Sequence, residues 1–182
     1  MTRGKLTQGR RSGYGRLLPA ALTILFVLNP SNASAQTDLD PFRELGPSTD
    51  LRNSAETIQD GLVNSSSIEQ VGLLNQAAIN QLGELNSVIA LQDGEMHQML
   101  AIQEGIGNYA DIHQYGAENT LLLEQIGNDN MALVEQGGFG NSAQVLQYGD
   151  NNFADVQQYG MHALIVVTQR GNNATAKIVT GL

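Results

Sequence analysis

The chain has 182 residues, a formal net charge of -9 and only 5% aromatic residues, so a large conventional hydrophobic core is not expected. It contains no cysteine, which excludes a fold held together by disulfides. Five of the nine basic residues lie within the first 16 positions, which leaves four basic residues against all 18 acidic ones in the rest of the chain. Nucleic acid is therefore a poor partner.

The first 35 residues have the organisation of a secretory signal. Basic residues precede the apolar stretch 17–28, which is too short to span a bilayer, and Ala33 and Ala35 stand where a signal peptidase requires small side chains. We expect residues 1–35 to be a signal peptide. Residues 36–52 contain two prolines, mixed charge and no sustained periodicity, so an extended leader is expected there.

From residue 53 onward the sequence repeats every eleven positions. The unit is Asn-x-φ-x-φ-x-Gln-x-Gly-x-x, where φ is apolar. Gln recurs at Gln59, Gln70, Gln81, Gln92, Gln103, Gln114, Gln125, Gln136, Gln147, Gln158 and Gln169. Gly follows two positions later, at Gly61, Gly72, Gly83, Gly94, Gly105, Gly116, Gly127, Gly138, Gly149, Gly160 and Gly171. Asn opens most units, at Asn53, Asn64, Asn75, Asn86, Asn108, Asn119, Asn130, Asn141 and Asn152.

The composition of the unit favours strands over helices. An eleven-residue period also suits a right-handed coiled coil, but a Gly in every unit would cost a helix about 1 kcal/mol each time. Between Asn and Gln the apolar residues instead alternate with a period of two, and of the 24 φ positions only Thr57 and Ser66 are not apolar. The sequence therefore predicts seven-residue strands joined by four-residue turns that contain the Gly.

Two strands and two turns make a coil of 22 residues. Twelve strands then give six coils of a flat, two-sheet, all-β solenoid over residues 53–182, with coils about 4.8 Å apart, the cross-β spacing. The 14 acidic residues from Glu56 to Asp155 support this stacking, because four pairs of them lie 11 positions apart and none lies 22 apart. Like charges stacked along a ladder are destabilising, whereas the one charged match at 22, Asp155 with Lys177, has opposite signs.

The recurring amides have a structural reason in this geometry. They face inward at the two ends of each strand, where a buried amide without a partner costs about 1–3 kcal/mol. Stacking an identical amide on the coils above and below satisfies them and fixes the register of every strand. The sequence therefore predicts a Gln ladder and an Asn ladder along the solenoid.

This repeat, Gln-x-Gly-x-x-Asn-x-Ala-x-Val-x-Gln, resembles the curlin repeat of bacterial curli fibres, and the resemblance covers about residues 53–182. It implies an extracellular functional amyloid that is secreted unfolded across the inner and outer membranes. It also implies partners, namely a dedicated outer-membrane secretion channel with its accessory proteins, and self-association into a fimbrium that serves cell adhesion and biofilm formation. The leader 36–52 would be recognised during export.

Within this family, the near-uniform units resemble the minor subunit, which nucleates the major curli subunit and holds the fibre to the cell. The last two units depart from the pattern, since Ala163 and Ala174 replace Asn. They also contain Arg170 and Lys177, the only basic residues after Arg52, so we expect this end to contact the anionic cell surface. The alternatives are a major fibre subunit and a monomeric β-solenoid adhesin or enzyme.

The sequence offers no constellation for catalysis, metal or cofactor binding. The three histidines occupy different positions of the repeat, and the carboxylates form no acid and base pair. We expect His97 to replace Asn as an inward-facing, hydrogen-bonding residue. We also expect low pH to speed assembly, because acidic side chains keep unassembled chains apart.

Overall fold

The computed structural model describes residues 52–181. The predicted signal peptide, 1–35, and almost all of the predicted leader, 36–52, lie outside these residues. The described part of the chain consists of strands and short connections, and it contains no helix long and apolar enough to cross a membrane.

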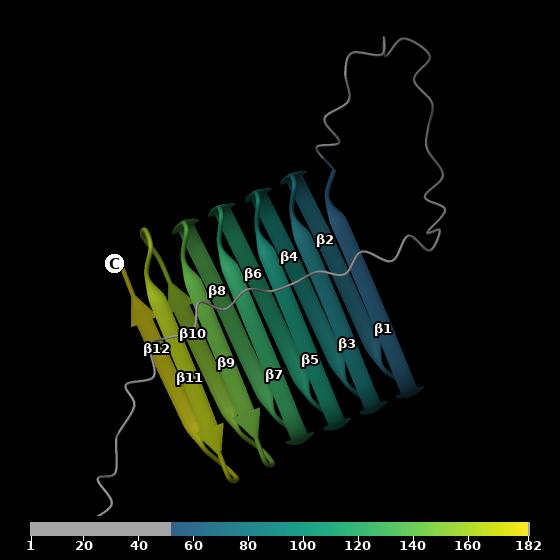
Figure 1. The fold of residues 1–182 in the computed structure, drawn as a ribbon. Coiled ribbons are helices and arrows are strands. Elements are labelled where there is room, and N and C mark those ends of the chain that lie inside the picture. Colours follow the sequence, from purple (N-terminus) through teal and green to yellow (C-terminus); the bar gives the residue numbers. More distant parts are fainter. Residues whose placement is uncertain (1–51, 182) are drawn as a thin grey trace, which may run out of the picture. The chain divides into compact units, whose positions relative to one another are not determined.

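Twelve strands follow one another along the chain (Figure 1). They are β1 (Ser54–Leu62), β2 (Ser65–Leu73), β3 (Gln76–Glu84), β4 (Ser87–Glu95), β5 (Gln98–Ile106), β6 (Tyr109–Ala117), β7 (Thr120–Asn128), β8 (Met131–Phe139), β9 (Ser142–Tyr148), β10 (Phe153–Gln158), β11 (Leu164–Arg170) and β12 (Thr175–Thr180).

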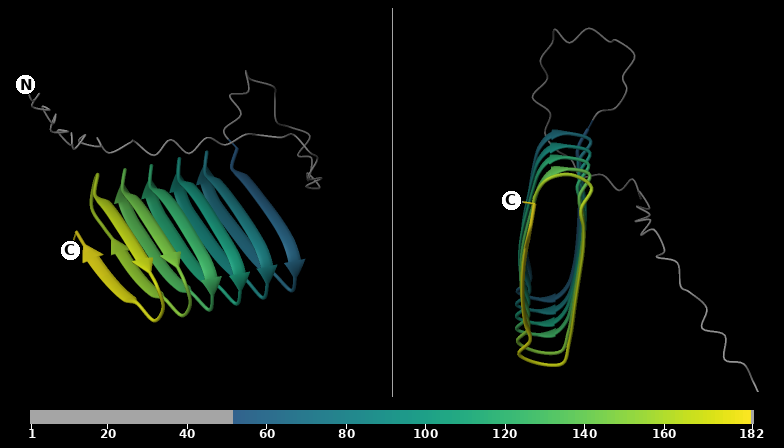
Figure 2. Two further views of the ribbon diagram at one scale, coloured as in Figure 1. Left: turned by 60° about the horizontal axis from the view of Figure 1, so that its bottom comes forward. Right: turned by 90° about the vertical axis from the view of Figure 1, so that its left-hand side faces the viewer.

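The strands alternate between two parallel sheets of six. The odd sheet has the order β1-β3-β5-β7-β9-β11, and the even sheet has the order β2-β4-β6-β8-β10-β12. In both sheets each residue pairs with the residue 22 positions later, as Gln81 does with Gln103. Viewed along the stack, the coils are flat and lie over one another (Figure 2). The predicted two-sheet solenoid of six 22-residue coils is confirmed.

The connections are shorter than predicted. Strands β1 to β8 have nine residues each and run through the repeated Gly, so that only two residues, such as Val63 and Asn64, connect one strand to the next. The prediction of seven-residue strands and four-residue turns was therefore wrong for these strands. The Gly remains in the ladder, where Gly105 pairs with Gly127, and its φ of +121° lies in a region that L side chains rarely adopt.

A left-handed residue forms the corner of each coil, at the fourth position after the Gln. Its backbone N–H continues the stacking, as when Leu85 donates to the carbonyl oxygen of Leu62 at 3.0 Å. Two corners use Gly107 and Gly140, but the other nine use residues with a side chain, at φ of 54–60°. These are Val63, Leu74, Leu85, Met96, Glu118, Asp129, Asn151, His162 and Asn173.

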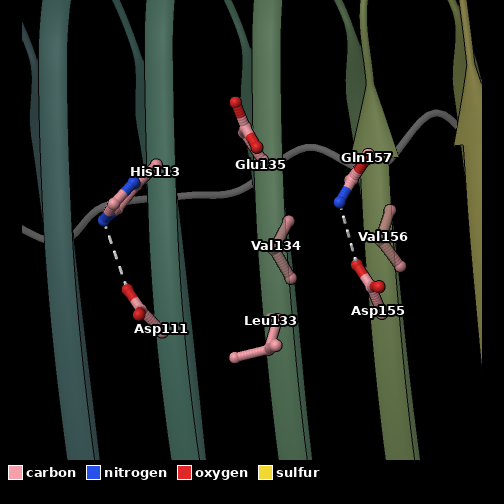
Figure 3. Close-up of a pocket in the computed structure, with 8 residues that line it drawn as sticks. All are labelled: Asp111, His113, Leu133, Val134, Glu135, Asp155, Val156 and Gln157. Carbon is pink, nitrogen blue, oxygen red and sulfur yellow. Dashed lines mark hydrogen bonds and ion pairs between the residues drawn. The ribbon is translucent and has the colours of Figure 1, made fainter.

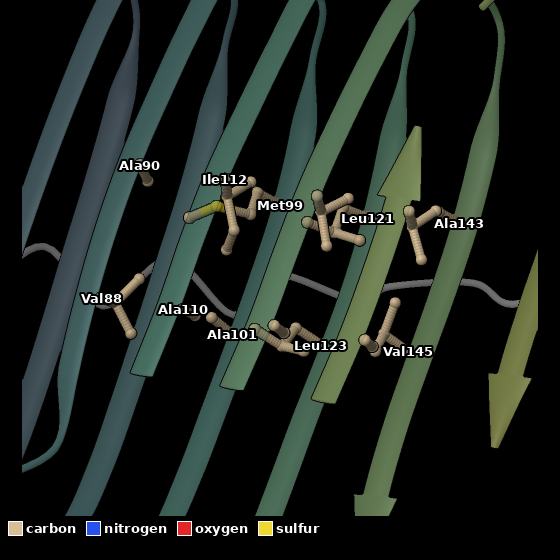
Figure 4. Packing of buried hydrophobic residues seen from close by; sticks show 14 of the residues in the cluster. Val88, Ala90, Met99, Ala101, Ala110, Ile112, Leu121, Leu123, Ala143 and Val145 are labelled. Carbon is tan, nitrogen blue, oxygen red and sulfur yellow. The ribbon is translucent and has the colours of Figure 1, made fainter. Parts of the chain in front are cut away.

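The hydrophobic core lies between the two sheets. Apolar side chains alternate along the strands, and the inward ones of the interior coils, such as Met99, Ile112 and Leu121, are fully buried. Figure 4 shows such side chains from both sheets directed into the same narrow space. Small Ala residues recur at the first inward position, as Ala110 and Ala132 do, which lets the sheets approach closely.

Candidate functional site

The repeated Gln residues form two continuous hydrogen-bonded columns, one within each sheet. In every step the Nε2 of one Gln donates to the Oε1 of the Gln 22 positions later, at 2.6–2.9 Å. All the donors therefore point the same way along the solenoid, toward the last coil. From Gln81 to Gln158 these side chains are essentially inaccessible to solvent.

Each Gln also ties the two sheets together. From Gln70 onward, Nε2 donates a second bond, at 2.9–3.3 Å, to the backbone carbonyl 16 positions earlier, at the start of the preceding strand. For Gln125 this carbonyl belongs to Tyr109 in the opposite sheet. One amide thus fixes both the register within a sheet and the position of the other sheet.

The Asn columns differ from the amide-to-amide stacking that the sequence predicts, because most of their hydrogen bonds join a side chain to the backbone. Every Asn of the set accepts, through Oδ1, the backbone N–H of the residue 22 positions later, at 3.0–3.1 Å. Every Nδ2 donates to the carbonyl of a repeated Gly 19 positions later, at 2.7–3.3 Å. Amide-to-amide bonds of 3.0–3.2 Å occur in the described chain only between Asn64, Asn86, Asn108 and Asn130.

As predicted, His97 replaces an Asn. It belongs to the Asn column that lies just before the first residues of the odd-numbered strands. It is fully buried, its backbone N–H donates to Oδ1 of Asn75 at 3.0 Å, and its Nδ1 accepts the backbone N–H of Asn119 at 3.3 Å. Nε2 lies 3.3 Å from the carbonyl oxygen of Asp93. These partners select the neutral tautomer protonated on Nε2. Burial lowers the pKa of His97, and the bond to the Asp93 carbonyl opposes this shift only in part.

At the first coil, four groups of these columns have no partner within residues 52–181. They are the Oε1 atoms of Gln59 and Gln70 and the backbone N–H groups of Asn53 and Asn64. In later coils the same Gln oxygen accepts from the coil before it, and the same backbone N–H donates to an Asn of the coil before it, or at Asn119 to His97. The first coil therefore ends the stack with two acceptors and two donors in fixed positions.

The last coil does not carry the matching groups. Ala163 and Ala174 donate their backbone N–H groups to Asn141 and Asn152 but have no side-chain oxygen to offer onward. Thr180 stands where the even Gln column would continue, and its buried Oγ1 has no hydrogen-bond partner in the described part of the chain. Only Gln169 continues its column. The two ends of the solenoid are thus chemically different.

The two candidate anchoring residues lie in this last coil but on opposite faces of it. Arg170 is on β11, where its guanidinium carbon lies 5.7 Å from the ring centroid of Tyr148. Lys177 is on β12, where Nζ contacts Oδ2 of Asp155 at 2.7 Å. The structure does not bring the two cations together, because they project from different sheets. On the same outward face of β11, Leu164 and Val166 are 69% and 55% exposed, so this face of the last coil is apolar as well as basic.

The outer face of the even sheet carries a shallow pocket over β6, β8 and β10 (Figure 3). Asp111 and Asp155 lie on either side of Leu133 in the same register column, so the carboxylates are separated by one coil. Asp111 contacts His113 at 3.3 Å. No cluster of three or more metal-ligating side chains occurs among residues 52–181.

Two tyrosines hold carboxylates against the outer faces. The hydroxyl of Tyr115 donates to Glu135 at 3.2 Å, and that of Tyr148 donates to Glu124 at 3.2 Å. Desolvation, followed by the nearby negative charge of Glu135, raises the pKa of Tyr115 to about 12. Both hydroxyls therefore act as neutral donors at physiological pH.

Together, the fold and the ladders define a class of protein: a β-solenoid whose interior coils are joined by buried amide columns, and whose first coil leaves column groups without partners within residues 52–181. The family model described as the curlin associated repeat matches residues 100–127 and 127–160, in the central and later coils. These matches support the curlin-repeat family, which is associated with extracellular curli fibres. The comparisons with curated proteins and with solved structures gave no match.

Proposed function

We propose that the protein is an extracellular amyloid subunit of curli-type fibres, and that it is the minor subunit, which nucleates the major subunit and anchors the fibre to the cell. The curlin repeat matches support the broader part of this proposal. A structural repeat family of this kind is in keeping with a role in assembly. We further propose that residues 36–52 direct export through the outer-membrane channel after removal of residues 1–35.

The observation that carries the proposal is the open first coil. Soluble proteins usually protect the edge strands of a sheet with a cap, a bulge or charges, because an exposed edge pairs with other chains. Here β1 and β2 have no strand on their outer side within the described residues. Both strands also present ladder groups that have no partner among residues 52–181. An unfolded chain that adds to this edge gains backbone and amide hydrogen bonds at once, which lowers the ordering cost that slows spontaneous nucleation.

The last coil supports the anchoring role. A fibre subunit that only stacks would keep its ladders intact at both ends, whereas here Ala163, Ala174 and Thr180 interrupt three of the four columns. The same coil has exposed apolar side chains and the cation Arg170 on one face. We propose that this end contacts the anionic cell surface. Deletion of residues 163–182 should then release fibres from cells, and unchanged attachment would contradict the anchoring role.

Seeding tests the nucleating role. A few mole per cent of this protein, added to a purified major curlin-repeat subunit, should abolish most of the lag before fibres appear, as followed by dye fluorescence. The fibres should give the meridional cross-β reflection at about 4.8 Å. A control with the same amount of urea-unfolded protein separates templating by the folded edge from a crowding effect. Failure of this protein to enter fibres in the mixture with the major subunit, or an unchanged lag, would contradict the proposal.

A further inference from the structure

The two ends of the solenoid differ in which hydrogen-bonding groups they offer. If one molecule continues the stack of another, Asn53 and Asn64 of the second lie over positions 163 and 174 of the first. Gln59 and Gln70 likewise lie over positions 169 and 180, because the stacking interval is 22 residues throughout. The contacts that each junction requires can therefore be read from the contacts between interior coils.

Four column bonds join an interior coil to the next, in addition to the bonds that Asn Nδ2 and Gln Nε2 donate to backbone carbonyls, such as Asn64 to Gly83 and Gln81 to Ser65. Two Asn oxygens accept backbone N–H groups, as in the bond from Asn130 to Asn108 at 3.1 Å. Two Gln amides donate to Gln oxygens, as in the bond from Gln125 to Gln147 at 2.8 Å. The coil that docks on the first coil must therefore supply two Asn oxygens and two Gln amides.

The protein's own last coil supplies one of these four contacts. Gln169 has an amide for Gln59 of the next molecule, but Ala163 and Ala174 have no oxygen for Asn53 and Asn64. Thr180 has a short hydroxyl side chain in place of the amide that Gln70 requires. In a junction between two copies of this chain, the backbone N–H groups of Asn53 and Asn64 and the Oε1 atom of Gln70 would therefore lose their partners. Buried polar groups without partners are costly in free energy.

We infer that the first coil, β1 and β2, is the growing end, and that it accepts the last coil of a different chain, one whose two final strands both retain Asn-x5-Gln. This inference rests on the proposed function, because it specifies which surface templates and which partner it selects. The last coil of this protein is then a poor template for any curlin-repeat chain, since the incoming Asn N–H groups would find no acceptor at Ala163 and Ala174. Growth from this protein has one direction, and self-stacking is disfavoured.

Restoration of the last coil tests the inference with the whole protein. The restored variant carries Ala163→Asn, Ala174→Asn and Thr180→Gln, which complete all four columns. The control variant carries Leu164→Asn, Val166→Asn and Val179→Gln, the same new side chains at outward positions of the same coil. The restored protein should elongate its own seeds about tenfold faster or more than the unmodified protein does, whereas the control should not. Equal rates for the restored and unmodified proteins would overturn the inference, as would an equal acceleration of the control.

Cross-seeding then identifies the growing end. If fibres grow at the first coil of the seed, each incoming monomer docks through its own last coil. The initial elongation rate should then depend on whether the monomer is the restored or the unmodified protein, and not on which of the two forms the seed. If fibres grew at the last coil of the seed, the initial elongation rate would depend on which protein forms the seed. That result would overturn the assigned direction of growth. Formation of fibres with no difference between variants contradicts this inference alone, whereas a complete failure of all versions to form fibres contradicts the proposed function as well.

Discussion

Gly105 lies directly against Gly127 of the next coil, so closely that a methyl group on Gly105 would overlap the carbonyl oxygen of Gly127. The same relationship recurs along both sheets, for example between Gly83 and Gly105. The repeated Gly is therefore required by the approach of stacked backbones in addition to its own positive φ.

Substitution of Gly105 separates these two requirements. Gly105→Ala should lower the free energy of unfolding by about 2–5 kcal/mol, the sum of backbone strain and steric overlap. Gly171→Ala is the matched control, because its φ is +98° but nothing lies within 4 Å of the added carbon. The control should lose only the strain, about 1–3 kcal/mol, in urea denaturation followed by circular dichroism. Equal losses would show that backbone contact between coils is not the constraint.

The neighbouring residues Gln157 and Gln158 test the Gln ladder within one strand. Gln158 accepts from Gln136 at 2.9 Å and donates to the carbonyl oxygen of Ala163 at 2.7 Å, whereas Gln157 faces outward. Gln158→Leu should cost about 1–3 kcal/mol of unfolding free energy, because it leaves buried partners unsatisfied. Gln157→Leu should change it by less than about 0.5 kcal/mol. Similar denaturation midpoints for the two variants would contradict the role of the ladder.

His97 makes the stability of the solenoid depend on pH. The pKa of His97 is lowered in the folded state, so the unfolded chain binds a proton more readily as the pH falls below about 6.5. Its contribution to stability is therefore fully present above pH 6.5 and is lost as the pH falls toward the lowered pKa. Protonation also removes the Nδ1 acceptor from the N–H of Asn119.

His97→Asn should remove this pH dependence by restoring an ordinary ladder amide. Denaturation midpoints of the variant and the unmodified protein, measured from pH 8 to pH 5, should diverge as the pH falls, with the variant the more stable. His113→Asn is the control, because His113 projects outward and is half-exposed. A constant gap between the His97 variant and the unmodified protein across this range would exclude His97 as the responsible group.

Leu133 separates two carboxylates on the outer face of the even sheet. It pairs with Asp111 on one side and with Asp155 on the other, so Leu133→Glu would stack three acidic residues in register. We expect a loss of about 1 kcal/mol at pH 7 and low salt, and recovery near pH 4 or at high salt. Leu100→Glu, between Ala78 and Leu122, is the control and should show neither effect. A salt-independent loss in both variants would indicate lost packing instead of charge repulsion.

The sequence predicts the fold well because its constraints repeat. The invariant spacing of Gln81 and Gln103, and the absence of acidic pairs 22 positions apart between Glu56 and Asp155, are enough to identify the stacking partner of each strand. The inward position of His97 follows from its place in the Asn series. Identical residues at one register position leave few alternative arrangements, which is why the sheet order and the number of coils could be derived.

The turns and the Asn bonds could not be derived in the same way. The left-handed corners are occupied by residues as different as Val63, Leu85 and His162, so the position has no shared chemistry to reveal it. An Asn side chain is one methylene shorter than Gln and lies beside the corner, where backbone N–H and carbonyl groups of the next coil are within reach. Asn108 therefore bonds mainly to backbone, an outcome that depends on a turn geometry the sequence pattern does not specify.

Because each coil takes one strand from each sheet, the even number of strands leaves both ends of the solenoid level, with β1 and β2 at one end and β11 and β12 at the other. Loss of a single eleven-residue unit would leave one sheet a strand longer than the other. The next molecule in a stack would then have to start in the opposite sheet, and its outer faces would be exchanged relative to those of its neighbour. The parity of the repeat number thus decides whether a long assembly has two distinct and continuous sides or sides that alternate from molecule to molecule.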